Sequence, residues 1–332
     1  MYLVSILVPV YGAEQYIERC IRSLFDQTYL NIEYIFVDDC SPDRSVDIIR
    51  NISNEYPNRE YWIKIICHKE NRGLAAARNT AVEHANGLFI SHVDSDDFLE
   101  KDAIRLLVEK QLEEDADLVS GYSIRHLLNK DILIVPPSFI TKEEWIKELL
   151  RTDHIYNHVI WGRLLRIDLY RNHNIKNKEG CNQGEDWQVL PQLAYYANKV
   201  SVIDDIVYHY DCTNENSMCR NNTKANLNSW LQDIASVKYM ASFFKDKESY
   251  YAHISSNVIM KTMKSYLYLS AKYTEKEFFF QLLKEMSAYR NNYYAIGWDN
   301  PIKRTWDCWY LGKVLYLKIR TLVWKSIKSI LK

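Results

Sequence analysis

The sequence predicts an α/β fold in which helices cover both faces of a mostly parallel sheet. Two observations lead to this prediction. Short apolar runs alternate with amphipathic segments over the first 122 residues, which is the rhythm of βαβ units. Acidic clusters also follow directly on two of the apolar runs, at 38–39 and 94–97. Because open α/β sheets bind ligands at the carboxyl ends of their strands, these clusters predict a binding site at that edge.

Each expected element of this region rests on its apolar pattern. The runs that read as buried strands are Leu3–Val8, which Pro9 ends, then 34–37, Trp62–Ile66, 88–93 and 117–122. The segments with helical spacing of apolar residues are 13–25, 43–55, Leu74–Asn86 and 99–114. This alternation favours parallel pairing, because each helix carries the chain back across the sheet.

The rhythm loosens beyond residue 123. Pro136-Pro137 breaks the chain, and Thr141–Glu144 has the pattern of a helix start. The stretch Asn172–Gly184 is polar and irregular. Strand character returns at Val200–Tyr210, and residues 225–290 read as helices. We therefore expect a regular first half followed by a less regular, more helical remainder.

The acidic clusters, Asp38-Asp39 and Asp94-Ser95-Asp96-Asp97, bring carboxylates together without nearby bases. Such carboxylates repel one another unless a cation lies between them. A hard divalent ion, Mg²⁺ or Mn²⁺, that also carries the phosphates of a substrate suits these oxygen ligands. For the first cluster an alternative is that one aspartate caps the helix that follows.

Composition describes an ordinary globular protein with one asymmetry. The chain has 332 residues, 47% of them hydrophobic, and a net charge of −1, which argues against a protein that coats nucleic acid. Residues 303–332 carry eight basic side chains and one acidic one, so this segment is +7 and the rest of the chain is −8. A basic tail on an acidic body suggests an anionic surface as its partner.

Cysteine use and the start of the chain point to the cytoplasm. The seven cysteines are scattered and form no Cys-x-x-Cys pair, as expected of reduced thiols. The first residues begin a strand at once and lack the features of a signal peptide. No apolar run has the length of a membrane span.

Five motifs follow one another in the first 100 residues: Ser5–Tyr11, Ser23–Tyr29, Phe36–Ser41, Asn71–Gly73 with Ala77–Asn79, and Asp94–Asp97. In this order and spacing the chain resembles the family 2 glycosyltransferases of the GT-A fold. The resemblance continues more loosely through Trp161–Leu164, Glu185–Trp187 and Tyr208–Tyr210, and it covers roughly residues 1–220. It implies the transfer of a sugar, with inversion, from a nucleotide sugar.

The resemblance implies roles for residues around the nucleotide. Pro9 and Tyr11, on the loop after the first strand, form the wall beside the base. Asp39 accepts a hydrogen bond from the uracil ring, whereas Asp38 has a ligand role or caps the next helix. Arg78 faces the nucleotide or the diphosphate from its helix, and the alternative is a surface arginine.

The same resemblance identifies Asp94-Ser95-Asp96 as the DxD motif. Asp94 lies near the ribose and the metal, Ser95 joins the donor-binding residues, and Asp96 binds the metal itself. The metal, Mn²⁺ or Mg²⁺, stabilises the leaving nucleotide as its charge develops. We expect Asp97 to cap the next helix. His209 is either a late ligand of the metal or diphosphate, or a hydrogen-bonded histidine of the core.

The acceptor side needs a base, and the resemblance places it in the acidic pair Glu185-Asp186. Asp186 is expected to remove the proton of the acceptor hydroxyl while oxygen attacks the anomeric carbon, with Glu185 as the alternative. Trp161 and Trp187 line the acceptor sugar or belong to the core. Asp211 stands where many relatives have a basic residue, which weakens any role of residues 211–217 in clamping the diphosphate.

From residue 311 onward, apolar side chains gather on one side of a helical wheel and basic ones fill most of the rest. Trp306, Trp309 and Tyr310 precede this segment. A basic amphipathic helix with aromatic residues suits the surface of an anionic membrane. The alternative is a helix that docks on its own domain or on a second copy of the chain.

These observations predict a metal-dependent inverting transferase at the cytoplasmic face of the membrane. The expected donor is a UDP-sugar, and the expected acceptor is a polyprenyl-diphosphate oligosaccharide of an O-antigen, capsule or exopolysaccharide. The alternatives are an assembly protein with a vestigial donor site and a sugar-phosphate nucleotidyltransferase, which would need a glycine-rich phosphate loop. The expected parts are a catalytic domain at 1–220 (donor half 1–122, acceptor half 123–220), a helical extension at 221–302 and a basic tail at 303–332.

Overall fold

The computed structural model describes residues 2–59, 62–137, 141–150, 158–213, 227–273, 277–282 and 284–286. The chain divides into two compact units, one up to residue 221 and the other from residue 222 onward. The basic segment 303–332 lies outside the described residues. Among the helices that are described, none combines the length and the apolar character needed to cross a membrane.

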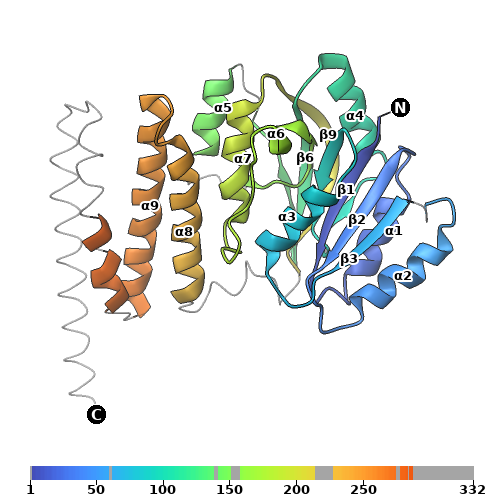
Figure 1. The fold of residues 1–332 in the computed structure, drawn as a ribbon, viewed down its shortest axis with the longest axis horizontal. Helices are drawn as coiled ribbons and strands as arrows, with labels where there is room; N and C mark the ends of the chain where they lie inside the picture. The colour runs from blue at the N-terminus through green and yellow to red at the C-terminus, as the bar shows by residue number, and fades with distance from the viewer. Residues whose placement is uncertain are drawn as a thin grey trace, which may run out of the picture. The chain divides into compact units, whose positions relative to one another are not determined.

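The first unit begins with the predicted βαβ rhythm (Figure 1). Four strands pair in parallel in the order β3-β2-β1-β4. They are β1 (Val4–Val10), β2 (Ile32–Asp38), β3 (Ile63–Cys67) and β4 (Phe89–His92). The helices between them are α1 (Ile17–Phe25), α2 (Ser45–Glu55) and α3 (Leu74–His84). This confirms the α/β fold and explains why both acidic clusters lie at the same edge of the sheet.

Beyond β4 the sheet becomes mixed, in the order β4-β8-β6-β9-β5 with β7 on β6. These strands are β5 (Phe98–Leu99), β6 (Leu118–Leu127), β7 (Lys130–Ile134), β8 (Arg163–Arg166) and β9 (Val200–Asp211). The helices of this half are α4 (Ala103–Glu114), α5 (Lys142–Leu149), α6 (Asp168–Arg171) and α7 (Glu185–Tyr196). The short β8 lies antiparallel between β4 and β6, and the apolar pattern did not predict it.

Several boundaries differ from the sequence prediction. Pro9 does not end the first strand, because β1 continues to Val10. The pairing of β1 with β4 stops at Leu7, so Pro9 lies where β1 has one neighbour only and a residue without N–H is tolerated. The helix expected from residue 13 begins at Ile17. The one expected from residue 99 begins at Ala103, because Phe98–Leu99 pairs with β9 instead.

The predicted helix start at Thr141 is confirmed as a capping box. The Thr141 hydroxyl accepts a hydrogen bond from the Glu144 backbone N–H, and the Glu144 carboxylate accepts one from Thr141. This reciprocal pair satisfies two of the backbone donors that a helix N-terminus leaves open. Helix α5 therefore begins where the local sequence specifies it.

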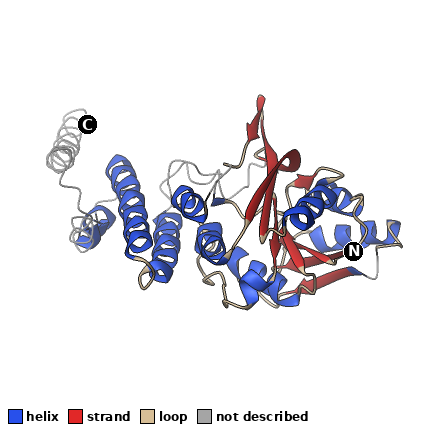
Figure 2. Cartoon of the chain, turned by 90° about the horizontal axis from the view of Figure 1, so that it is seen from above, coloured by secondary structure: helices blue, strands red, loops and turns tan. Residues whose placement is uncertain are grey.

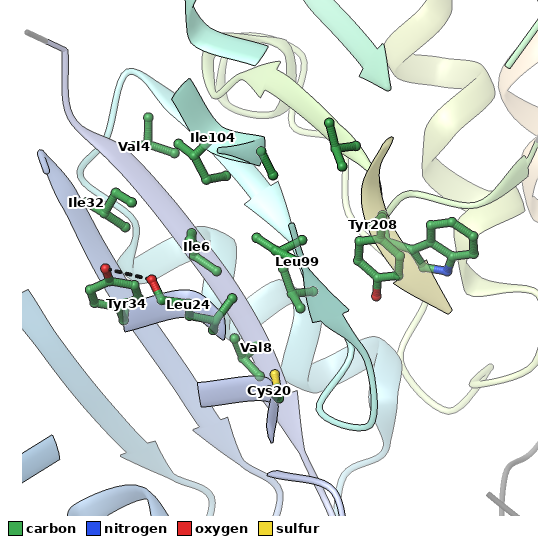
Figure 3. Packing of buried hydrophobic residues seen from close by; sticks show 14 of the residues in the cluster. Val4, Ile6, Val8, Cys20, Leu24, Ile32, Tyr34, Leu99, Ile104 and Tyr208 are labelled. Atoms are coloured by element: carbon green, nitrogen blue, oxygen red, sulfur yellow. Dashed lines mark hydrogen bonds between the residues drawn. The ribbon is translucent and has the colours of Figure 1, made fainter. Parts of the chain in front are cut away.

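The main apolar core lies between one face of the sheet and helices α1, α2 and α4. Alternate residues of β1, namely Val4, Ile6 and Val8, point to this face. Ile6 and Val8 lie near Leu24 of α1, and Val4 lies near Ile104 (Figure 3). The Tyr34 hydroxyl donates to the Leu24 carbonyl at 3.1 Å, so the ring can be buried with its polar end satisfied. Burial of these side chains holds the strands and thereby the edge that carries the acidic clusters.

The opposite face of the sheet is covered by α3, and Figure 2 shows helices on both sides of the strands. The buried residues of α3 include Ala75, Ala76, Ala77 and Ala81, whose small side chains allow the helix to approach β1 and β2 closely. Arg78 is buried among them, 2% exposed. An alanine-rich helix thus brings a charged side chain into the interior.

The buried carboxylate of Glu33 links β1, β2 and β3 at the edge of the sheet where the strands begin. Glu33 of β2 accepts hydrogen bonds from the Ser5 hydroxyl at 2.5 Å, from Lys64, and from the backbone N–H groups of Asn86 and Gly87. Gly87 is required here, because a Cβ would lie 2.7 Å from the Ser5 backbone nitrogen. Burial alone would raise the pKa of Glu33, but the hydrogen bonds lower it below its ordinary value.

The second unit contains α8 (Leu227–Phe244) and α9 (Ser249–Tyr273), which pack against each other. Trp230 of α8 is buried and stacks on Tyr266 of α9 with ring centroids 5.5 Å apart. The half-buried Asp233 is hydrogen-bonded to the Tyr266 hydroxyl. The predicted helical character of this region is confirmed for the residues that the structure describes.

We expect Glu33→Ala to lower the free energy of unfolding by about 3 kcal/mol, because it leaves several buried donors without an acceptor. The pKa of Glu33 is lowered by folding, so its contribution is present above the ordinary pKa of glutamate and is lost as the pH falls through the folded value. Urea unfolding at pH 7 and pH 4 measures both effects. Glu113→Ala, at an exposed glutamate, is the control and should change little. Equal stability of the two variants would contradict this role of Glu33.

Candidate functional site

The Asp94–Asp97 turn follows β4 at the carboxyl edge of the sheet, as predicted, and Tyr208 of β9 holds it in place. The Tyr208 hydroxyl accepts a hydrogen bond from the Asp94 backbone N–H at 3.1 Å and donates one to the Asp97 carboxylate at 2.7 Å. Trp161 stacks on the Tyr208 ring with centroids 4.5 Å apart and planes 10° from parallel. Trp161 is 5% exposed, so it supports the turn from the core and does not line an open surface.

Arg78 joins the turn after β4 to the start of α7. Its Nη2 lies 3.0 Å from Asp94 Oδ1, 3.2 Å from Glu185 Oε1 and 3.6 Å from Asp186 Oδ1. Burial alone would lower the pKa of Arg78, but these three carboxylates raise it above the ordinary value. One buried cation thus faces three carboxylates, two of which begin α7 while the third follows β4.

Burial of several carboxyl groups around one guanidinium changes the pKa values of Glu185 and Asp186. Burial and the neighbouring Asp186 raise the pKa of Glu185 to about 8. Burial also raises the pKa of Asp186, to about 6, although Arg78 acts against this. Because the two carboxyl groups interact, they titrate as a pair, and both hold a proton to higher pH than ordinary carboxyl groups do.

Hydrogen bonds between α3 and the irregular stretch before α7 bring these residues together. The Asn79 side chain donates to the Asn177 carbonyl at 2.9 Å and accepts from the Asn177 backbone N–H at 2.8 Å. The side-chain amide of Asn177 in turn donates to the Glu185 backbone carbonyl at 2.7 Å. A stretch that reads as polar and irregular therefore acts as the frame that holds the start of α7 beside Arg78.

Asn182 adds a second link by capping α3 from outside the helix. Its side-chain oxygen accepts from the Ala75 backbone N–H at 3.1 Å. This contact requires Gly73, which has φ +88°, because a Cβ there would lie within 2.5 Å of the Asn182 amide. Arg72 and Glu179 form an exposed two-point ion pair, with N–O distances of 2.9 and 3.0 Å, that connects the same two segments.

Asp39 lies at the same edge, but its carboxylate is largely engaged within the protein. It accepts hydrogen bonds from the backbone N–H groups of Arg72 at 2.9 Å and Gly73 at 2.6 Å. His68 Nδ1 lies 2.7 Å from the same carboxylate. Asp39 therefore holds the loop before α3 in place, in addition to any contact with a ligand.

The first acidic cluster does not cap a helix. Asp38 accepts a hydrogen bond from the Ser41 backbone N–H and so shapes the turn after β2. The following helix, α2, receives its N-terminal bonds from Asp43, whose carboxylate accepts from the Ser45 backbone. Nearby, Pro9 is buried in β1, not on a loop, whereas Tyr11 is 55% exposed beyond the strand end. Of the two expected wall residues, only Tyr11 presents a large open surface.

The observed contacts contradict the expected capping role of Asp97 and weaken the expected role of His209 as a ligand. Asp97 does not cap α4, which has no side-chain cap. Its carboxylate instead receives the Tyr208 hydroxyl and the Asp211 backbone N–H. His209 has both ring nitrogens in hydrogen bonds, with Glu100 at 2.8 Å and His126 at 2.9 Å, and it stacks on Phe98. Binding a metal through His209 would break one of these bonds, so we leave it out of the proposed ligands.

The Asp94–Asp97 turn suits a divalent cation that a substrate helps to hold. In the parts of the chain that the structure describes, no three His, Cys, Asp or Glu side chains lie together so as to bind a metal ion by themselves. The turn nevertheless carries excess negative charge. Burial, then the charges of Asp96 and Asp94, raise the pKa of Asp97 well above its ordinary value. Two aspartates with phosphate oxygens as further ligands are a usual set for Mg²⁺.

Several residues that build this site were not identified from the sequence as functional. The sequence motifs include Tyr208 without assigning it a role, Trp161 is expected either to line the acceptor sugar or to belong to the core, and His68 and Asn182 carry no sequence signal. Their partners are between 29 and 114 residues away along the chain. No local pattern marks such pairs, because the contacts form only when strands and loops are brought together.

Comparison of the sequence with known proteins gives one family match and similar proteins from bacteria. The family model described as glycosyl transferase family 2 matches residues 5–173. The chain is 32% identical over 236 residues to the uncharacterized glycosyltransferase EpsJ of Bacillus subtilis, and this match covers 69% of this chain and 67% of EpsJ. It is 27% identical over 238 residues to the minor teichoic acid biosynthesis protein GgaB of Bacillus subtilis, covering 68% of this chain but 25% of that protein.

A solved structure shows the same fold. S. aureus TarS 1-349 in complex with UDP-GlcNAc superposes with a TM-score of 0.69 at 20% sequence identity, and the match covers 86% of this chain and 81% of that one. This likeness confirms the fold that the sequence motifs implied.

We expect Arg78→Met to lower the free energy of unfolding by about 4 kcal/mol, because it leaves three partly or fully buried carboxylates without their cation. The loss should shrink as the pH falls, since protonation removes the repulsion. Urea unfolding at pH 7.5 and pH 5 measures it. Adding Asp94→Asn and Glu185→Gln to Arg78→Met should restore part of the stability. The matched control is Arg22→Met, at an exposed arginine, and a loss no larger than in this control would refute the role of Arg78.

Proposed function

The chain belongs to glycosyl transferase family 2 and is a glycosyltransferase, and from this premise we propose that it transfers a sugar, with inversion, from a UDP-sugar to a lipid-linked saccharide. The acceptor is a polyprenyl-diphosphate oligosaccharide that becomes part of a bacterial surface polysaccharide. The proposed residues are those at the carboxyl edge of the sheet. Residues 1–220 form the catalytic part, with the donor side within 1–122.

One observation carries this proposal: a single buried arginine gathers Asp94 of the turn after β4 with Glu185 and Asp186 of α7. A transferase must place the leaving diphosphate and the acceptor hydroxyl on opposite sides of one anomeric carbon. The shared contact with Arg78 brings the proposed donor residue and the proposed base to adjacent positions. Proximity of this kind makes a large contribution to rate when two substrates react.

We assign the general base to Asp186. Its pKa, raised to about 6, leaves the carboxylate charged at neutral pH yet makes it a better proton acceptor than an ordinary aspartate. The acceptor hydroxyl donates its proton to Asp186 as its oxygen forms the bond to the anomeric carbon. The bond from that carbon to the diphosphate oxygen breaks, and the electron pair leaves with UDP. Glu185, whose pKa is raised further, keeps its proton and limits the repulsion beside the base.

Asp94 and Asp96 are the proposed ligands of Mn²⁺ or Mg²⁺, with the donor diphosphate completing the set. When bound, such an ion neutralises the charge that develops on the leaving diphosphate. Asp94 also contacts Arg78, so its carboxylate is oriented before the donor binds. Ser95 lies between the two ligands in the same turn, and Tyr11 provides an exposed ring at the end of β1 for the base of the nucleotide.

The proposed acceptor and location in the cell are supported by one relative and by the composition of residues 303–332. GgaB, a relative of part of this chain, is named for teichoic acid biosynthesis, and this agrees with a polymer of the cell surface. The basic composition of residues 303–332 agrees with attachment to an anionic membrane from the cytoplasmic side. We propose peripheral attachment there, close to a lipid-linked acceptor.

Substitution of the proposed base and of a metal ligand should separate chemistry from donor binding. Asp186→Asn should lower kcat for sugar transfer by about 10³-fold while UDP still binds in the presence of Mn²⁺. Asp96→Asn should weaken Mn²⁺-dependent UDP binding itself. Calorimetric titration with UDP, with and without EDTA, measures binding, and release of UDP from a panel of UDP-sugars measures turnover.

Asp102→Asn is the control, because this aspartate lies on the surface at the start of α4. Folded Asp186→Asn and Asp96→Asn proteins with full transfer activity would refute the assignment. Absence of UDP binding by the unmodified protein, together with absence of turnover with every donor, would favour an assembly protein with a vestigial site.

The pH dependence of kcat/KM tests the base more directly. Asp186 acts in its deprotonated form, so kcat/KM should rise with pH through the raised pKa, about 6, and level off above it. An unperturbed aspartate would shift this rise to about pH 4. Initial rates of transfer between pH 4.5 and 8, with circular dichroism at each pH to confirm folding, measure the midpoint. A midpoint near 4 would contradict the assignment.

A further inference from the structure

The side chain of Arg19 connects helix α1 to the Asp94–Asp97 turn and to the end of β9. Its Nη2 atom donates to the Asp96 backbone carbonyl at 2.9 Å and to the Asp211 carboxylate at 2.5 Å. Residues 19 and 211 are 192 positions apart along the chain, so only the fold brings these two charges together. One guanidinium nitrogen thus joins the backbone of the turn to the last residue of β9.

Arg19 is held more firmly than an ordinary surface arginine, although its side chain is 45% exposed. Its guanidinium carbon lies 4.5 Å from the centroid of the Phe98 ring, which is a cation–π arrangement. Phe98 in turn stacks on His209 with centroids 4.3 Å apart and planes 4° from parallel, so this ring is itself fixed. The guanidinium is therefore bound both through its face and through Nη2, whereas an exposed ion pair alone would leave it largely free to move.

Asp211 is a fixed partner for this arginine. Its side chain is 5% exposed, and its Oδ1 accepts from the Thr213 backbone N–H at 2.7 Å and from the Thr213 hydroxyl at 2.6 Å, while Oδ2 faces Arg19. The backbone N–H of Asp211 donates to the Asp97 carboxylate at 2.8 Å. A buried carboxylate requires a partner of opposite charge, and Arg19 supplies it. Asp211 is thus attached to the turn twice, directly through Asp97 and indirectly through Arg19.

The two proposed metal ligands are oriented in different ways. Arg78 contacts the carboxylate of Asp94, whereas Arg19 contacts the backbone of Asp96. Because a side chain adopts only a few rotamers relative to its own backbone, a fixed carbonyl at Asp96 limits where its carboxylate can lie. The turn is therefore contacted by two arginines, one at each proposed ligand.

We propose that Arg19 is a positioning residue for the Asp94–Asp97 turn, and that through its pair with Asp211 it fixes the backbone of Asp96 before the donor binds. The inference rests on the proposed function in one respect, namely that Asp96 binds the metal that holds the diphosphate of the donor. Binding to a turn that is already ordered avoids the entropy loss of ordering it. The effect of Arg19 is therefore on donor affinity and not on the chemical step.

Two variants separate this role from a general loss of stability. Arg19→Met removes the cation and leaves the buried Asp211 carboxylate without it, so this change should lower both UDP affinity and stability. Adding Asp211→Asn removes the unpaired charge, while the backbone N–H of residue 211 still donates to Asp97. The double variant should therefore unfold at nearly the urea concentration of the unmodified protein. Its Kd for UDP in the presence of Mn²⁺ should still be about tenfold higher, because the bond to the Asp96 carbonyl is missing.

Calorimetric titration with UDP and Mn²⁺ measures Kd, and initial rates with the UDP-sugar that the unmodified protein turns over measure KM and kcat. We expect KM of the double variant to rise with Kd while kcat changes less than about threefold. Arg19→Lys keeps a charge toward Asp211 but loses the planar guanidinium over Phe98, so it should recover affinity in part. A double variant that binds UDP as tightly as the unmodified protein would overturn the positioning role.

Arg22→Met is the matched control. Arg22 lies on the same helix and is 38% exposed, but its partners are Glu18 and Glu55, and neither belongs to the turn. This variant should leave the Kd for UDP unchanged. An equal rise of Kd in Arg22→Met and Arg19→Met would contradict a specific role of Arg19.

Hydrogen exchange tests the same role without any ligand. The backbone N–H groups of Asp94 and Asp97 donate to the Tyr208 hydroxyl and to the Asp94 carbonyl. If Arg19 orders the turn, both should exchange faster in the double variant and at an unchanged rate in Arg22→Met. Equal exchange in the double variant and the unmodified protein would overturn the inference. Faster exchange in the double variant, together with an unmodified protein that does not bind UDP, would support the ordering role and count against the proposed function alone.

Discussion

The site depends on the burial of one arginine among three carboxyl groups. Arg78 is almost fully enclosed, and the cost of removing its charge from water is met only because Asp94, Glu185 and Asp186 surround it. Burial, together with the neighbouring carboxylates, raises the pKa values of Glu185 and Asp186. The arrangement of the site, the raised pKa values and the proposed chemistry therefore all depend on the burial of these charged side chains.

The fold brings these charges together through two different constructions. The parallel half of the sheet places the turn after β4 beside the loop after β2, as the topology of open α/β sheets requires. The mixed half contributes Tyr208 of β9, which clamps the turn, and α7, which carries the acidic pair. The alanine-rich α3 lies between them and supplies Arg78, while Asn79 and the capped N-terminus of α3 hold the stretch before α7.

Much of this arrangement could be predicted from local patterns. The strands of the parallel half, the capping box at Thr141 and the position of Asp94 at a strand end follow from apolar period and capping chemistry. The mixed pairing of β8 could not be predicted, because Arg163–Arg166 is too short to show a period and its partners lie far along the chain. The hydrogen-bond partners of Asp97 and Asp39 likewise could not be predicted from the sequence. Each looks like a cap or a ligand in sequence, and each is in fact engaged by distant backbone N–H groups.

The sequence by itself determined the class of fold, the edge of the sheet where the acidic clusters gather and the family to which the chain belongs. These depend on short-range features, namely apolar period, turn chemistry and motifs with fixed spacing. Only the tertiary structure decided which charged side chains pair with one another. It enclosed Arg78 among carboxylates from two segments 91 residues and more apart, separated the pKa values of Glu185 and Asp186, and occupied both nitrogens of His209. Burial and charge pairing are properties of three-dimensional neighbourhoods, and no local pattern in the chain specifies them.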